Sequence, residues 1–157
     1  MTEILDIKFT AKGIARALSN FTHRSFVLDG VQCASIEGVL QATKTANVAT
    51  QKARCLLSGV EAKHSGRNGP DWQRDQMLHW QNSAMPRKGA EYRAFLERLF
   101  NAVFAQCPEF CQSLADSGQA TLTHSIGKTD RSKTVLTRQE FIQQLERLRE
   151  QLRNRES

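Results

Sequence analysis

Residues 91–106 carry the most regular apolar pattern of the chain and therefore constrain its fold most strongly. Their apolar side chains recur every three or four residues: Tyr92, Phe95, Leu96, Leu99, Val103 and Phe104. This spacing is that of an α-helix with one broad apolar face. Because so many large side chains need partners from other elements, we expect this helix to form the centre of the core.

Shorter patterns on both sides of this segment predict further helices. Residues 35–44 have Ser35 as a candidate N-cap. The last helix begins with Thr137 and Glu140 at capping-box spacing and places Leu residues on one side. Further helices are expected at residues 50–58, 58–66, 71–80 and 108–118, with Pro70 near the first turn of the 71–80 helix.

Strand signals are few and short. Residues 4–9 alternate in polarity, and two β-prone pieces flank Asp29-Gly30, a dipeptide typical of tight hairpins. Residues 120–127 predict another brief strand, whereas 83–90 are expected to form a loop. The chain of 157 residues has the length of one domain, so residues 1–157 are predicted to form a single helix-dominated α+β domain with a small antiparallel sheet.

The net charge of the chain indicates which kinds of partner it can bind. The formal charge is +6, which favours anionic partners, either nucleic acid or phosphorylated small molecules. No run of 18 apolar residues exists and the N-terminus has no signal-peptide core, so we expect no membrane span and a cytoplasmic location. The spacing of the four cysteines does not suggest zinc, so we expect reduced thiols, no metal and no cofactor.

One stripe of the 35–44 helix attracts attention because its residues are not apolar. Glu37, Gln41 and Lys44 fall at i, i+4 and i+7 and therefore share a face. Lys44 lies about 10.5 Å along the axis from Glu37, a span suited to a ligand of nucleotide size. The stripe is either the solvated side of an amphipathic helix or one wall of a pocket, and spacing alone does not decide between them.

Other polar residues are weaker candidates when taken alone. Asn20 in "LSNF" is a turn-former or a ligand contact. Lys63 and Arg67 in "AKHSGR" could hold a phosphate or simply follow a helix C-terminus. His124 in "LTHSIG" could be a structural residue, a ligand or a general acid.

Together these fragments resemble the YbiA-like family, also called NADAR. The resemblance rests on "LSNF" with Ser19 and Asn20, on "FVLDG", and on E-x-x-x-Q-A-x-K at residues 37–44. It extends through "AKHSGR" at 62–67 and Trp72 to the closing helix, and so spans nearly the whole chain. The most specific part is residues 18–44.

The resemblance implies an N-glycosidase that cleaves an ADP-ribosyl or phosphoribosyl compound, such as ADP-ribosyl-guanine (free or in nucleic acid) or a riboflavin-pathway intermediate. Glu37 would then stabilise positive charge at the sugar C1 or act as general acid or base. Lys44 would bind a phosphate or attack the opened sugar as a Schiff-base nucleophile. The ligand-binding residues implied by analogy are Ser19, Asn20, Gln41, Lys63, Arg67, Trp72 and His124.

Two departures keep other functions open. The family commonly has His after the helix Glu, where this chain has Gly38, and the Trp-Gly and Asn-x-x-Gly patterns are replaced by "HSIGKTDRSKTVLTRQEF". A non-catalytic ADP-ribose or nucleotide reader is therefore the main alternative. A small nucleic-acid binder using the basic 128–133 loop and the Arg-rich tail is a third reading, marked by steep salt dependence.

Overall fold

The computed structural model describes residues 3–67, 69 and 71–156. In chain order the elements are β1 (Ile4–Asp6), α1 (Gly13–Ala17), β2 (Phe26–Leu28), β3 (Val31–Cys33), α2 (Ile36–Ala42), α3 (Val48–Cys55), α4 (Gly59–Ser65), α5 (Trp72–Asp75), β4 (Met77–Trp80), β5 (Ser83–Pro86), α6 (Ala90–Gln106), α7 (Pro108–Asp116), β6 (Thr121–Thr123) and α8 (Arg138–Glu156). The fold is α+β and dominated by helices, as the sequence predicts. Pro70 lies outside the described residues. None of the helices in the described ranges is long and apolar enough to cross a membrane.

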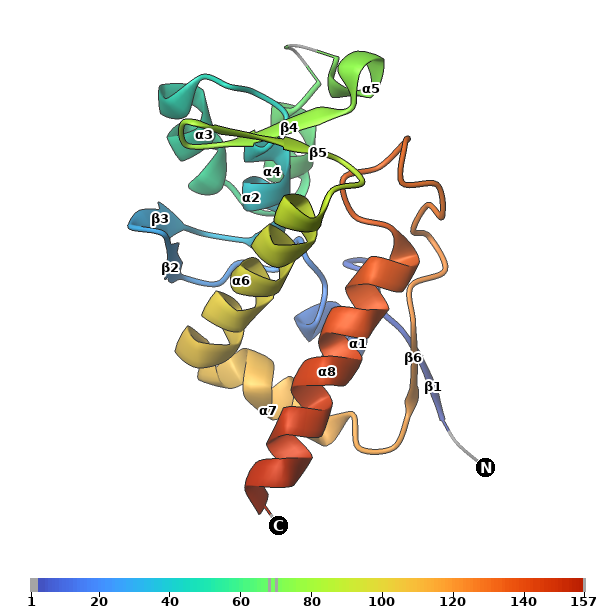
Figure 1. Cartoon of the computed structure of the whole chain (residues 1–157). Coiled ribbons are helices and arrows are strands. Elements are labelled where there is room, and N and C mark those ends of the chain that lie inside the picture. Colours follow the sequence, from blue (N-terminus) through green and yellow to red (C-terminus); the bar gives the residue numbers. More distant parts are fainter. Residues whose placement is uncertain (1–2, 68, 70, 157) are drawn as a thin grey trace.

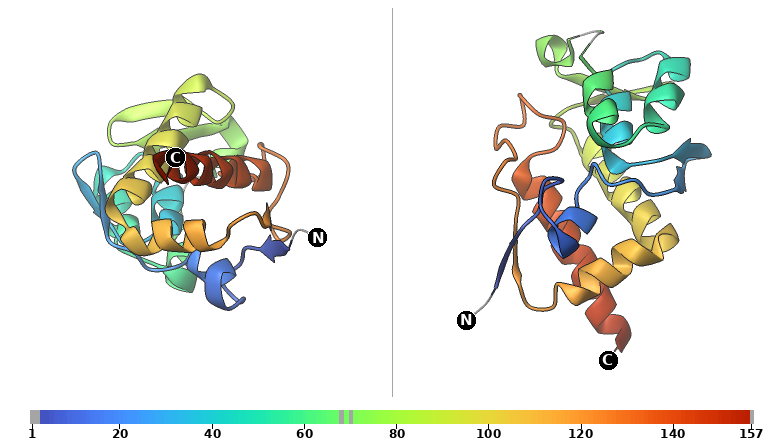
Figure 2. Two further views of the ribbon diagram at one scale, coloured as in Figure 1. Left: turned by 90° about the horizontal axis from the view of Figure 1, so that it is seen from below. Right: turned by 180° about the vertical axis from the view of Figure 1, so that it is seen from behind.

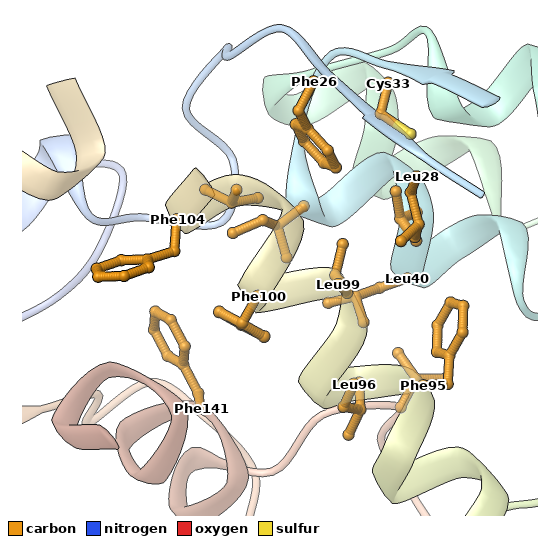
Figure 3. Close-up of a cluster of buried hydrophobic side chains, with 14 of the residues drawn as sticks. Phe26, Leu28, Cys33, Leu40, Phe95, Leu96, Leu99, Phe100, Phe104 and Phe141 are labelled. Carbon is orange, nitrogen blue, oxygen red and sulfur yellow. The ribbon is translucent and has the colours of Figure 1, made fainter. Parts of the chain in front are cut away.

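The long helix α6 forms the centre of the core. All six apolar residues predicted to line its inner face are buried. Figure 3 shows side chains of α6 between those of the β2–β3 hairpin and α2 on one side and Phe141 of α8 on the other. Helix α8 begins with the predicted capping box, in which Thr137 and Glu140 exchange side-chain to backbone bonds of 2.8 and 3.1 Å.

Helices α2, α3 and α4 gather at one end of α6, with the β4–β5 hairpin beside them (Figure 1). Ser35 caps α2 as expected, because its hydroxyl accepts a bond of 2.9 Å from the Gly38 N–H. The segment between β6 and α8 runs along the other side of the molecule, next to the chain that follows β1 (Figure 2). The pocket described below lies between these two parts.

The strands pair two by two. Asp29 and Gly30 both have positive φ, 48° and 82°, and turn β2 into the antiparallel β3, as a tight hairpin requires. β1 and β6 pair in parallel, with Ile4 opposite Thr121. This parallel pair brings the segments that follow the two strands to the same place, although more than 110 residues separate them.

Residues 71–90 differ from the prediction. The expected 71–80 helix ends at Asp75, and the expected 83–90 loop contains a strand, so β4 and β5 form an antiparallel hairpin. Gln76 adopts the left-handed conformation at φ 59°, which ends the helix after one turn. Gln81 has φ 54° at the hairpin turn. Glutamine does not predict a left-handed conformation, since glycine and asparagine are the usual signals.

Candidate functional site

A pocket of about 520 Å³ lies between α2, α4 and α5 on one side and the segments after β1 and β6 on the other. Its walls include residues 8–10 after β1, residues 19–21 before β2, and residues 124, 126–128 and 133–136 between β6 and α8. The parallel β1–β6 pair aligns the first and third of these segments. The pocket is thus built from chain segments that are distant in sequence.

The α2 helix presents the polar stripe to this pocket. The Glu37 N–H donates a bond of 3.0 Å to the Asn20 backbone oxygen, which ties the "LSNF" segment to the first turn of α2. Gln41 donates from Nε2 to Glu37 Oε1 at 2.7 Å, as i, i+4 neighbours on a helix can. Although α2 ends at Ala42, the next residues continue its last turn, and Lys44 still lines the pocket.

Burial disfavours the charged forms of Glu37 and Lys44, the residues at the two ends of the stripe. Desolvation raises the pKa of the Glu37 carboxyl, while the Gln41 hydrogen bond and the Lys44 and Lys63 charges act in the opposite direction. Desolvation lowers the pKa of the Lys44 ammonium; Glu37 opposes this, and nearby positive charges, Arg54 foremost, add to it. Shifted pKa values of an acidic and a basic group in one cleft are typical of functional sites.

Lysines dominate the charge of the pocket. Lys8, Lys44, Lys63, Lys128 and Lys133 line it, whereas Glu37 is the only carboxylate among the described lining residues. Aromatic and aliphatic side chains, including Phe9, Phe21, Trp72 and Leu136, supply the apolar surface. Such a lining suits a ligand that carries anionic groups together with a flat or apolar part.

Two buried amide oxygens in the lining have no hydrogen-bond partner among the described residues: Asn20 Oδ1 and Gln41 Oε1. The Gln41 amide nitrogen is the atom that bonds to Glu37, so this contact leaves the amide oxygen without a partner. Gly66 packs against this amide, since a Cβ at position 66 would lie 1.9 Å from Gln41 Oε1. Unpaired buried acceptors are costly, and a ligand hydroxyl or N–H is one way to satisfy them.

The structure places most of the predicted site residues around this one pocket. The lining includes Ser19, Asn20, Glu37, Gln41, Lys44, Lys63, Trp72 and His124. Arg67 is exposed and is not among the described lining residues. Trp80 packs against Phe95 with ring centroids 5.3 Å apart and belongs to the core. No group of three or more His, Cys, Asp and Glu side chains that could hold a metal ion occurs within residues 3–67, 69 and 71–156.

Sequence reasoning missed part of the lining. Lys8 and Phe9 follow a short strand, and nothing in their local pattern separates them from an ordinary loop. Lys128 and Lys133 were noted only as part of a basic loop suited to phosphates. The parallel pairing of β1 with β6 was the information needed to join these residues to the α2 stripe.

A second hollow of about 310 Å³ lies between α3 and the two hairpins. Its buried amide, Gln51, is satisfied: Nε2 donates to the Thr45 backbone oxygen at 2.8 Å, and Oε1 accepts from the Gln81 N–H at 2.8 Å. Its lining offers one lysine, Lys52. The larger pocket, with its unpaired amides and five lysines, is therefore the candidate site.

Comparison with known proteins agrees with this arrangement. Residues 12–150 match the family described as bacteriophage protein GP30.3. The chain belongs to the GP30.3 family. A 17.1 kDa protein of Enterobacteria phage T4, from the Gp30–rIII intergenic region, is 32% identical over 149 residues, which is 94% of this chain and 98% of the phage protein. The NMR structure of the E. coli protein YbiA superimposes with a TM-score of 0.64 at 17% identity, covering 99% of this chain and 89% of YbiA. This GP30.3-family chain therefore has a YbiA-like fold, which confirms the predicted resemblance.

Gly38, one of the departures from the YbiA-like pattern, lies on the side of α2 that packs on α3. A Cβ at this position would lie 2.6 Å from the Arg54 backbone oxygen and 2.9 Å from that of Leu57. Glycine therefore permits close contact of the two helices in this GP30.3-family protein. Because position 38 is not part of the pocket lining, its glycine does not itself remove a group from the site.

Proposed function

We propose that this protein is an N-glycosidase that cleaves the bond between a base and the sugar of an ADP-ribosyl or phosphoribosyl compound. The observation that carries the proposal is the placement of Glu37, the one carboxylate of the described lining, beside five lysines in a pocket of nucleotide size. The lysines would hold phosphate groups. Trp72 would stack on a base, and Asn20 and Gln41 would accept hydrogen bonds from sugar hydroxyls.

Glu37 would act on the departing base. As the C1′–N bond breaks, its electron pair goes to the base nitrogen, which takes a proton, and the sugar C1′ develops oxocarbenium character before the oxygen of water adds. Because burial raises the pKa of the Glu37 carboxyl, a larger fraction of this carboxyl carries a proton to donate at a given pH. The carboxylate that results stabilises positive charge at C1′.

Lys44 has two possible roles that predict different products. As an ammonium it would bind a phosphate oxygen. Burial lowers the pKa of Lys44 and so increases the fraction present as free amine, which could form a Schiff base with the opened sugar and later release it to water. Borohydride reduction would trap the Schiff base as a stable adduct on Lys44, and no adduct forms if the lysine only binds phosphate.

The main alternative is a reader that binds ADP-ribose or a nucleotide without turnover. The five lysines, Trp72 and the amides would serve binding equally well, and such a module would not need Glu37 for affinity. Loss of the Glu37 carboxyl should therefore abolish turnover by an N-glycosidase but leave the affinity of a reader unchanged.

Mass spectrometry of products tests the proposal. Wild type, Glu37→Gln and Glu61→Gln would be incubated with ADP-ribosylated guanine, free and in DNA, and with phosphoribosyl-aminopyrimidines. Glu61 is exposed on α4 and outside the lining, so its variant is the matched control. We expect base release by wild type and Glu61→Gln, and a loss of about 10²–10⁴-fold in Glu37→Gln with binding retained. No release by any protein, together with ADP-ribose binding by all three, would establish the binding module instead.

A further inference from the structure

The imidazole of His124 forms a part of the pocket wall that the proposed chemistry has not used. His124 directly follows β6, so it reaches the pocket from a different element than Glu37 and Lys44 on α2. Its Nδ1 lies 2.6 Å from the Ile7 backbone oxygen. Its ring stands edge-on to Phe141, at 86° with centroids 5.0 Å apart.

These contacts set the position of the ring hydrogen. A carbonyl oxygen can only accept, so the short contact with Ile7 requires a hydrogen on Nδ1. In the neutral ring the lone pair is then on Nε2. In this form the imidazole can accept a proton at Nε2.

The surrounding backbone holds the ring in place. Gly127 donates its N–H to the His124 backbone oxygen at 2.9 Å, and a Cβ at position 127 would lie 2.5 Å from the imidazole Cδ2. The Asp6 carboxylate accepts a bond of 2.8 Å from the Ser125 N–H and another from the Ser125 hydroxyl. The turn that carries His124 is therefore fixed to β1 on one side and folded closely around the imidazole on the other.

We propose that His124 is the catalytic base that activates the attacking water, an inference that rests on the proposed N-glycosidase function. Water adds its oxygen to C1′ and gives a proton to His124 Nε2, while the C1′–N bond breaks toward the base nitrogen, which takes the proton of Glu37. The imidazolium and the Glu37 carboxylate that result exchange one proton through solvent. The net change is the addition of one water across the glycosidic bond.

Glu37 is assigned as proton donor and His124 as proton acceptor because their surroundings differ. Glu37 is enclosed by α2 and its neighbours, which favours its protonated form. His124 has its Nδ1 hydrogen committed to Ile7 and keeps an acceptor nitrogen. One pocket thus holds a proton donor and a proton acceptor on separate elements, as hydrolysis with two participating groups requires.

Azide rescue distinguishes a base from a residue that merely shapes the pocket. Azide attacks C1′ without having to lose a proton, so it bypasses a missing base but not a damaged pocket. We expect His124→Ala to reduce base release about 10²–10⁴-fold in water. Added azide should restore release at least in part and yield a glycosyl azide detectable by mass spectrometry.

Two further variants keep the result interpretable. His124→Asn retains an amide N–H for the Ile7 oxygen but has no Nε2, so it should fold, bind substrate and show the same defect and rescue. His64→Ala removes an exposed imidazole of α4 outside the lining and should match wild type. All variants would be compared in substrate binding and thermal unfolding.

The possible failures are distinct. If wild type releases no base from any substrate, the N-glycosidase proposal falls and the role of His124 falls with it. If wild type is active but the His124 variants are equally active, or lose activity without azide rescue or a glycosyl azide, then the base role is overturned while the N-glycosidase proposal stands.

Discussion

Removing the buried guanidinium of Arg87 should destabilise the wall of the pocket and the fold together. Arg87 is 1% exposed, and its two terminal nitrogens contact the Glu140 carboxylate at 2.6 and 3.2 Å. Its Nε donates to the Thr134 backbone oxygen at 2.8 Å, and its guanidinium lies over the Tyr92 ring. The Tyr92 hydroxyl in turn donates to the Val135 backbone oxygen at 2.6 Å. Arg87 thus connects β5, the pocket-lining residues 134–135 and the start of α8.

The magnitude follows from what Arg87→Met leaves behind. The variant keeps the apolar volume but removes the partner of the largely buried Glu140 carboxylate, and breaking a buried ion pair in this way costs about 3–5 kcal/mol. For a chain of this length that loss lowers Tm by about 6–20 °C. The Glu140→Gln change removes the charge while an amide oxygen still accepts from the Thr137 N–H. Arg87→Met/Glu140→Gln should therefore lose only about 1–2 kcal/mol, mainly for the Thr134 bond.

Urea unfolding followed by circular dichroism measures the cycle of wild type, two single variants and the double variant. The double variant must be more stable than Arg87→Met for the reasoning to hold. A loss below about 1 kcal/mol in Arg87→Met, or a double variant no better than the single one, would refute the argument that an uncompensated buried charge is the main cost.

Three further outcomes follow from the contacts of α2. Because burial raises the pKa of Glu37, the folded protein binds its proton more tightly than the unfolded chain, so wild-type stability falls as pH rises from 4.5 through the raised folded-state pKa. In urea titrations Glu37→Gln should gain stability relative to wild type over that range, and a pH-independent difference would contradict this. Gly66→Ala should displace the Gln41 amide and weaken ligand binding in calorimetry with little change in Tm, whereas equal affinity would show that the amide is not needed. Gly38→Ala meets the rigid backbone oxygen of Arg54 and should cost about 1–3 kcal/mol in thermal unfolding despite its better helix propensity, and an unchanged Tm would show that α2 and α3 separate freely.

The elements predicted correctly from the sequence are those that depend on a few neighbouring residues. The apolar face of α6, the Asp29-Gly30 turn, the Ser35 cap and the Thr137–Glu140 capping box each depend on a few neighbouring residues, and all are present. The β4–β5 hairpin was missed because its left-handed positions are glutamines. Its pairing is decided by tertiary contacts instead, and those are not visible in a short window of sequence.

The residues of the candidate site also differ in whether local sequence could predict them. The polar α2 stripe could be recognised from its helical spacing. The lining residues of 8–10, 124, 126–128 and 133–136 could not, because they follow strands of three residues that pair across more than 110 positions. Arg87 carried no signal at all, because its partners Glu140 and Thr134 lie about fifty residues away. The pocket depends on that long-range assembly, and only the part that lies on one helix could be predicted from the sequence.

A comparison of buried polar groups gives independent support for the pocket as the functional site. Among residues outside the lining, each guanidinium nitrogen of Arg87 has a hydrogen-bond partner, and Arg149 donates to Ser117 Oγ at 3.1 Å and to the Ala120 oxygen at 2.9 Å. Two of the four buried side-chain atoms that lack a partner among the described residues, Asn20 Oδ1 and Gln41 Oε1, belong to residues of the pocket lining. Burial opposes the charges of Glu37 and Lys44 in the same place. The unpaired amide oxygens of Asn20 and Gln41 and the desolvated charges of Glu37 and Lys44 thus belong to one pocket, where a ligand could offset their cost. This is the pattern expected of a binding or catalytic site and not of a solvated helix face.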